Sequence, residues 1–137
     1  MRKIIDFKTA ILASLFILVI LILFHIAILV RILFFDSVPI DFLWGGKMKT
    51  EAQLFNIEIA SLLTSSIIFF LLLIRAKLLN IPKLLGFTRI AMWVLFVFFL
   101  LNTIGNALAT TMFERLFAIA SGALAFLFFR ISVEKNR

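Results

Sequence analysis

Hydrophobic and polar positions alternate in long blocks along the chain, and four apolar segments are separated by short polar ones. An α-helix rises 1.5 Å per residue, so about 20 apolar residues cross the ~30 Å hydrocarbon core of a bilayer. Each block, taken with its helix-compatible flanks, reaches that length. The pattern therefore predicts one all-α transmembrane domain over residues 1–137, arranged as a four-helix up-down bundle. The predicted spans are residues 9–35, 51–79, 82–109 and 112–133.

Local signals support these limits. Thr50 with Gln53, and Thr111 with Glu114, fit the capping box, in which a hydroxyl precedes a helix and Glu or Gln follows three residues later. Pro82 suits the first turn of a helix and cannot continue the preceding one. The first segment is too long for the apolar part of a signal peptide, and no small-x-small cleavage site follows it. We therefore expect it to remain as an uncleaved span.

Composition excludes several classes of protein. Of the 137 residues, 64% are hydrophobic and 15% are charged, and mean hydropathy is +1.22. Soluble domains are typically ~45–50% apolar and ~25% charged. A water-soluble monomer of this size could not bury that much hydrocarbon. A soluble enzyme, a secreted disulfide scaffold and a disordered tail are therefore excluded. The absence of cysteine also removes disulfides, thiolate ligands and thiol nucleophiles.

The charge pattern predicts an orientation. The formal net charge is +7 and the pI is near 10.6, but the cations lie between the apolar segments rather than along one polar face. No nucleic-acid partner is therefore expected. Ten Lys and Arg residues fall on the side that holds the N-terminus, the 75–89 loop and the C-terminus, against four on the other side. The positive-inside rule then predicts a multi-pass protein of the bacterial cytoplasmic (inner) membrane, N-in and C-in.

Ionisable and strongly polar side chains at membrane depth are costly and mark candidate functional sites. With this topology, all four predicted helices carry such residues towards the non-cytoplasmic side, whereas the cytoplasmic halves of the spans carry almost none. The nine residues, named here the polar cluster, are His25, Arg31, Asn56, Glu58, Asn102, Thr103, Asn106, Glu114 and Arg115.

The polar cluster has two interpretations. In the structural one, Glu58 pairs with Arg31 or Arg115, and the asparagines hydrogen-bond between helices and fix their register, at ~0.6–2 kcal/mol each. In the functional one, the cluster lines an outward-facing cavity for a small polar or anionic solute or a lipid headgroup. An arginine would then hold the anion, and Glu58 could take up a proton. Two further alternatives are a small-solute or proton-coupled transporter centred on Glu58 and an accessory subunit of a membrane complex.

Spacing indicates which of these groups can converge. Glu58, Ser61 and Ser65 follow the i, i+3, i+7 pattern and share one helical face, and the two asparagines of the third span are four residues apart. Two pairs of small residues are separated by three positions, Gly105 with Ala109 and Ala118 with Gly122. Such small-xxx-small pairs allow helices to approach closely. The second, third and fourth helices are therefore expected to pack with Glu58 and the asparagines pointing inwards.

Candidate chemistry beyond binding is sparse. His25 is the only histidine, whereas a metal normally takes three or four ligands, so no metal site and no cofactor are expected. The hydroxyls of Ser61, Thr64, Ser65 and Ser66 belong to a helix, where they commonly bond to the preceding turn. No nucleophile, base and orienting acid form a set, so we expect no enzymatic activity.

Two loops complete the prediction. Residues 36–50 contain apolar positions that are expected to cover the polar cluster, as a lid or a plug. The 75–89 loop carries four cations that would attract anionic lipids, each contributing about 1 kcal/mol near the surface. Membrane lipids are therefore the expected partners, with a second copy or another membrane protein as further candidates.

Three short motifs carry a resemblance: residues 42–46 are FLWGG, residues 102–106 are NTIGN, and Glu114 is followed by arginine. The combination resembles small, uncharacterised four-helix integral membrane proteins of bacteria, which implies a multi-pass helical fold and no activity. Small multidrug-resistance transporters carry their membrane glutamate in the first helix, where this chain has His25. Four-helix fluoride channels are glycine-rich, whereas this chain has five glycines.

Overall fold

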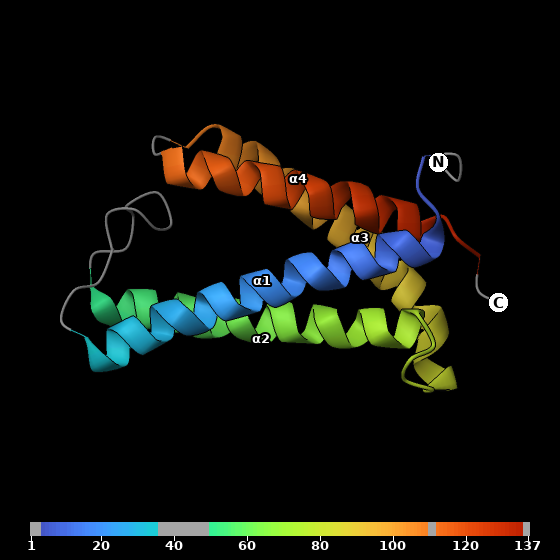
Figure 1. The fold of residues 1–137 in the computed structure, drawn as a ribbon, viewed down its shortest axis with the longest axis horizontal. Coiled ribbons are helices and arrows are strands. Elements are labelled where there is room, and N and C mark those ends of the chain that lie inside the picture. The colour runs from blue at the N-terminus through green and yellow to red at the C-terminus, as the bar shows by residue number, and fades with distance from the viewer. Residues whose placement is uncertain (1–3, 36–49, 110–111, 136–137) are drawn as a thin grey trace.

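The computed structural model describes residues 4–35, 50–109 and 112–135, and these residues form four helices (Figure 1). All four helices are long and apolar enough to cross a membrane, as the hydropathy pattern predicts. The chain therefore has the character of a multi-pass membrane protein. The helices are α1 (Phe7–Phe34), α2 (Glu51–Arg75), α3 (Pro82–Ala107) and α4 (Met112–Ser132).

The starts of the helices follow their capping residues. Thr50 accepts a hydrogen bond from the backbone N–H of Gln53 at 3.1 Å, so the first predicted cap is confirmed. Pro82 occupies the first turn of α3, also as predicted. Asp6 caps α1 by accepting from the N–H of Thr9 at 3.2 Å. Thr111, predicted to cap the last helix, lies outside the described residues.

The second helix ends at Arg75, four residues before the predicted limit at 79. Lys77 has φ = 62°, in the left-handed region, and its N–H donates to the carbonyl of Ile74. The N–H of Leu78 donates to the carbonyl of Leu73 at 2.9 Å. These two bonds make a Schellman motif, with lysine at the position where glycine is usual. Hydropathy cannot reveal this end, because the leucines that follow continue the apolar pattern.

The helices form two pairs, α1 with α2 and α3 with α4, which approach each other at one end and diverge at the other (Figure 1). At the first end α1 and α3 begin and α2 and α4 finish, as contacts between Arg130 and Ile5 and between Arg75 and Glu134 require. We call this the terminus end and the opposite one, where α1 and α3 finish and α2 and α4 begin, the far end.

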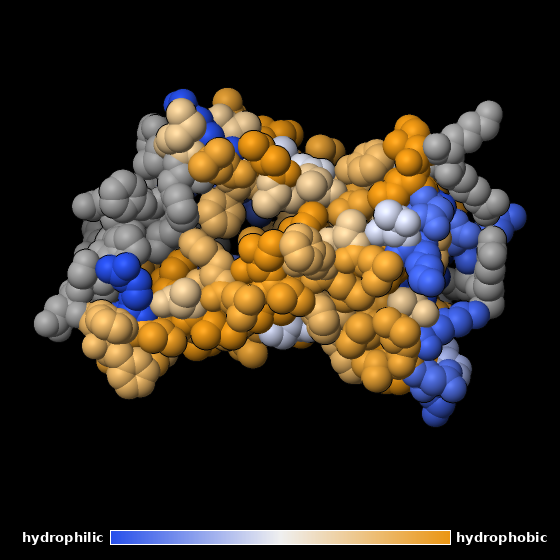
Figure 2. Space-filling view, in the orientation of Figure 1, coloured by the Kyte–Doolittle hydropathy of each residue, from blue (hydrophilic) through white to orange (hydrophobic). Residues whose placement is uncertain are grey.

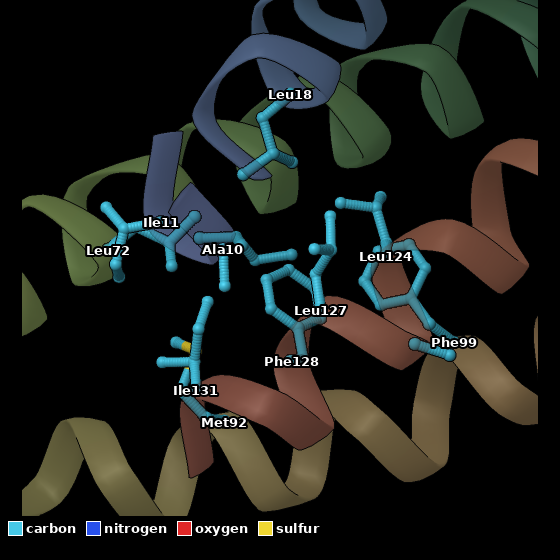
Figure 3. Packing of buried hydrophobic residues seen from close by; sticks show 12 residues of the cluster. Ala10, Ile11, Leu18, Leu72, Met92, Phe99, Leu124, Leu127, Phe128 and Ile131 are labelled. Atoms are coloured by element: carbon cyan, nitrogen blue, oxygen red, sulfur yellow. The ribbon is translucent and has the colours of Figure 1, made fainter. Parts of the chain in front are cut away.

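Most of the core lies in the half of the molecule nearer the terminus end. All four helices contribute to it, and Figure 3 shows side chains of α1 and α2 meeting those of α4 above α3. Phe128 is fully buried at its centre and contacts Phe99, with the ring centroids 5.4 Å apart and the rings tilted by 56°. The cluster consists of Ala10, Ile11, Leu18, Ile68, Leu72, Met92, Phe99, Leu124, Ala125, Leu127, Phe128 and Ile131.

A second, smaller cluster lies towards the far end and comes from α1 and α2 alone. Ile28 and Leu54 are buried in it, and Phe24, Ile32 and Ile57 pack against them. The remaining large apolar side chains are mostly exposed, and they cover the long middle of the molecule in Figure 2. An exposed apolar surface of this extent suits contact with lipid chains.

The two glycines of the small-residue pairs differ. A Cβ placed on Gly122 would meet the side chain of Thr103 at 3.5 Å, so this glycine lies where α4 approaches α3 closely. At Gly105 nothing lies within 4 Å. The predicted close approach at Gly105 is therefore wrong, because that face of α3 is turned away from the other described helices.

Candidate functional site

A cavity of about 370 Å³ lies between the two helix pairs, and all four helices line it. Figure 2 shows the molecule hollowed between the pairs. Five members of the polar cluster line this cavity, so helices far apart in the sequence bring them together. They are His25, Glu58, Asn102, Asn106 and Glu114.

His25 of α1 and Glu58 of α2 form the central contact. The imidazole Nδ1 lies 2.5 Å from a carboxylate oxygen of Glu58, and the two groups share a hydrogen bond. Glu58 is 1% exposed, and the histidine side chain is 12% exposed. His25 precedes the end of α1 by nine residues, which places it about 14 Å along the helix axis from Phe34. The pair therefore lies well inside the apolar length of the helices.

The face of α2 that was predicted from spacing is the face that lines the cavity. Glu58, Ser61 and Ser65 all contribute to its wall. Thr64 also lines it, but its hydroxyl donates to the carbonyl of Ala60 at 2.8 Å and so satisfies a bond within the helix.

The opposite wall comes from α3 and α4. Asn106 donates from Nδ2 towards Asn102 Oδ1 at 3.4 Å and towards the hydroxyl of Ser121 at 3.5 Å. Both distances are at the long end of the range for hydrogen bonds, so the protein holds this amide only weakly. Glu114, which the sequence assigns to a helix cap, is 7% exposed and also lines the cavity.

Aromatic rings form much of the apolar lining. Phe24 of α1 lies 5.2 Å from Phe117 of α4, measured between ring centroids, and this contact joins the two helix pairs. Phe98 and Phe99 of α3 line the cavity as well. The polar groups are thus set in an apolar wall, which is typical of sites that bind small molecules.

The other four members of the polar cluster lie elsewhere. Arg31 and Asn56 are exposed, and Thr103 donates to the carbonyl of Phe99 at 2.7 Å. Arg115 is exposed and donates from Nε to the carbonyl of Ala109 at 2.9 Å. No arginine or lysine belongs to the described lining of this cavity. The expectation that an arginine holds an anion beside Glu58 is therefore not supported, because the groups that line the cavity with Glu58 are an imidazole, a second carboxylate, amides and hydroxyls.

The predicted partner of Glu58 also needs correction. Arg31 or Arg115 was expected to pair with it, whereas the structure places the imidazole of His25 against the carboxylate. His25 lies 33 residues before Glu58 in the chain, and only the antiparallel packing of α1 on α2 brings the two to the same depth. The predicted lid or plug over residues 36–50 lies, apart from Thr50, outside the described residues.

The terminus end contains buried charged side chains that do not belong to the predicted polar cluster. Arg130 is 2% exposed; it donates from Nε to the carbonyl of Ile5 at 2.8 Å and from Nη1 to the carboxylate of Glu134 at 3.0 Å. Glu134 follows Arg130 by four residues, a spacing that the sequence already contained. The Arg130 side chain therefore ties the end of α4 to the segment that leads into α1.

Two further arginines satisfy the end of α4. Arg75 of α2 donates from Nη2 to the carbonyl of Glu134 at 2.5 Å and towards that of Ile131 at 3.4 Å. Arg89 of α3 donates from Nε to the carbonyl of Ser132 at 3.0 Å. The last carbonyls of a helix have no partner within it and carry partial negative charge. Cationic side chains from two other helices therefore bind the C-terminus of α4.

Comparisons with protein families, with curated proteins and with solved structures find no match to this chain. Among the residues that the structure describes, no group of three or more His, Asp or Glu side chains is placed to hold a metal ion. The geometry of the cavity therefore carries the functional assignment.

Proposed function

We propose that this chain is a multi-pass membrane protein whose cavity binds a small organic cation, such as a protonated amine, without catalysis. The observation that carries the proposal is the set of ionisable groups in the cavity wall. Glu58 and Glu114 are both buried there with His25, and the described lining contains no lysine or arginine. Two carboxylates and one imidazole carry a net negative charge whenever both carboxylates are ionised, or when one is ionised and the imidazole is neutral, and such a set favours a cation over an anion.

The aromatic wall supports the same class of ligand. Phe24, Phe98, Phe99 and Phe117 line the cavity, and an ammonium group is attracted to the faces of such rings when it is withdrawn from water. An anion would meet the negative faces of these rings and two carboxylates. The volume, about 370 Å³, falls within the range of small-molecule sites.

The test compares three probes of nearly the same shape: benzylammonium, benzyl alcohol and benzoate. With the purified full chain in detergent, we expect saturable binding of benzylammonium by equilibrium dialysis and no saturable binding of benzoate. A charge-assisted hydrogen bond contributes ~1.5–3 kcal/mol, so Glu58→Gln should weaken benzylammonium binding about tenfold or more. Equal binding of all three probes would contradict a cation site.

Two matched variants control this experiment. Asp6→Asn removes one carboxylate at the terminus end, and Asn56→Ala changes an exposed side chain of α2 close to Glu58. Neither residue lines the cavity, so both variants should bind benzylammonium as the unmodified chain does. Glu114→Gln provides a second variant within the cavity in case Glu58→Gln disturbs folding. If both glutamine variants fold and bind normally, the proposal is wrong.

We further propose an up-down bundle in the bacterial cytoplasmic membrane, with the terminus end in the cytoplasm. The excess of lysine and arginine at that end supports this orientation. The chain has no cysteine, so single cysteines report on sidedness directly. A membrane-impermeant maleimide added to intact spheroplasts should label Met112→Cys and spare Asn80→Cys, which lie at the far and terminus ends. The reverse result would invert the proposed orientation.

A second candidate function is proton-coupled transport of the same cation. The observation that favours it is the hydrogen bond between His25 and Glu58, because paired titratable groups at membrane depth form proton relays in transporters. Proteoliposomes with a pH gradient should accumulate radiolabelled benzylammonium, and Glu58→Gln should abolish the accumulation while Asn56→Ala preserves it. Binding without any gradient-driven accumulation would leave the binding function and remove the transport function.

A further inference from the structure

A second cavity, of about 470 Å³, lies at the terminus end, away from the cation site. The ends of α2 and α4, the start of α1 and the first turns of α3 surround it. Five cations line it, together with the carboxylates of Asp6 and Glu134, so its formal net charge is +3. Figure 2 shows hydrophilic residues gathered at this end of the molecule. The cations are Lys8, Arg75, Lys77, Arg130 and Lys135.

The five cations divide into two groups. Arg75 and Arg130 are buried and donate to backbone carbonyls of the protein, so they form the base of the cavity. Lys8, Lys77 and Lys135 are exposed and come from three different segments of the chain. Three exposed ammonium groups that line one cavity with two buried guanidinium groups suit an anion that carries several oxygens, such as a phosphate.

The backbone at Lys77 gives an independent reason to assign a function to this cavity. Lys77 has φ = 62°, at the C′ position of a Schellman motif that glycine would occupy without steric cost. A lysine side chain at that position therefore works against local stability. The same side chain lines the basic cavity, so this strained position places one more cation there.

The depth of the cavity indicates the source of the phosphate. Arg75 ends the apolar length of α2 and Lys8 begins that of α1, so the cavity lies where lipid headgroups meet the hydrocarbon. Apolar residues lie beside it: Leu85 lines the wall, and Leu78 and Phe87 are exposed nearby on the loop and on α3. Basic pockets between membrane helices at the cytoplasmic surface bind anionic lipid headgroups. We propose that this cavity binds the headgroup phosphate of one anionic phospholipid, with an acyl chain against the exposed apolar residues.

The experiment uses native mass spectrometry of the full chain in detergent, titrated with dioleoylphosphatidylglycerol or dioleoylphosphatidylcholine. We expect one tightly bound phosphatidylglycerol and only weak, non-stoichiometric adducts of phosphatidylcholine. We expect each lysine that lines the cavity to change the affinity for the anionic headgroup about fivefold. Lys77→Gly should therefore weaken phosphatidylglycerol binding about fivefold. The triple lysine variant, which adds Lys8→Gln and Lys135→Gln to Lys77→Gly, should weaken it further.

Lys77→Gly separates binding from folding, because it should raise the midpoint of thermal unfolding while it weakens lipid binding. Lys83→Gln is the matched control: Lys83 is an exposed cation of α3 at the same end that does not line the cavity, and its loss should leave binding unchanged. Equal binding of both lipids, unchanged binding in the triple lysine variant, or complete displacement of lipid by millimolar inorganic phosphate would each overturn the proposal.

Discussion

The two ends of the molecule are held together in different ways. At the terminus end, arginines of α2, α3 and α4 donate to backbone carbonyls of other segments, and a core from all four helices lies directly behind them. Towards the far end, His25 joins α1 to α2, Asn106 reaches Ser121 from α3 to α4, and the smaller core belongs to α1 and α2 alone.

The difference explains where a ligand can bind. At the terminus end the bonds of Arg75 and Arg130 run between the helix pairs and fix them against each other. The hydrogen bonds of His25 and Asn106 run within a pair, so the space between the pairs is left to the cavity and to the Phe24–Phe117 contact. The terminus end can thus act as a rigid scaffold for the cavity towards the far end, where polar groups are arranged for recognition. Binding residues are commonly positioned by such a scaffold.

The largest effect is expected from Arg130→Leu at the terminus end. The substitution leaves the Ile5 carbonyl and the Glu134 carboxylate without this donor, and loss of one partner of a buried ion pair typically costs ~3–5 kcal/mol. Reversible unfolding in mixed micelles should show a loss of about 3 kcal/mol in the free energy of unfolding. Arg115→Leu, at an exposed arginine of the far end, should cost less than about 1 kcal/mol. Equal losses would refute the difference between the ends.

Two leucines of α2 compare the cores directly. Leu72 and Leu54 are both fully buried, Leu72 in the four-helix cluster and Leu54 in the two-helix cluster. Leu72→Ala should cost about 3 kcal/mol and Leu54→Ala nearer 2, because packing against more helices leaves a cavity that collapses less completely. The same unfolding assay measures both. A larger loss for Leu54→Ala would reverse the assignment of the main core.

At the cavity, Glu58→Gln should affect stability far less than it affects binding. Hydrogen bonds between membrane helices contribute ~0.6–2 kcal/mol, and glutamine retains one acceptor for His25, so we expect a loss of about 1 kcal/mol. Asn56→Ala, on the same helix but exposed, should cost almost nothing. A loss as large as that of Arg130→Leu would show that His25 and Glu58 hold the bundle together rather than form a binding site.

The smallest effect is expected at Asp6, the exposed cap of α1. Hydrogen bonds from Thr9 lower the pKa of the Asp6 carboxyl from its ordinary value of 3.8. The charged form is therefore favoured by folding, and its contribution is present above pH 3.8 and lost as the pH falls through the lowered pKa. Asp6→Ala should lower the thermal midpoint slightly at neutral pH, and the difference from the unmodified chain should vanish in strong acid. A difference that grows in acid would contradict this sign.

Much of the fold could be predicted because the position and length of each apolar block determine where a helix forms. The predicted starts at 51, 82 and 112 coincide with the observed ones, and the predicted start at 9 lies two residues after Phe7. The end of α2 could not be predicted, because it depends on the left-handed backbone of Lys77 and not on hydropathy. Five of the nine residues of the polar cluster line one cavity. Each of the other four either lies near a helix end or turns away from the space between the pairs.

The sequence by itself determined that four apolar helices form and that polar side chains of all four lie towards one end, because hydropathy and spacing act locally along the chain. Only the tertiary structure decided that His25 meets Glu58, that no arginine lines their cavity, and that Arg75, Arg89 and Arg130 bind carbonyls at the opposite end. These outcomes depend on how the helices rotate and cross. One sequence does not specify that geometry, because many rotations bury nearly the same apolar surface.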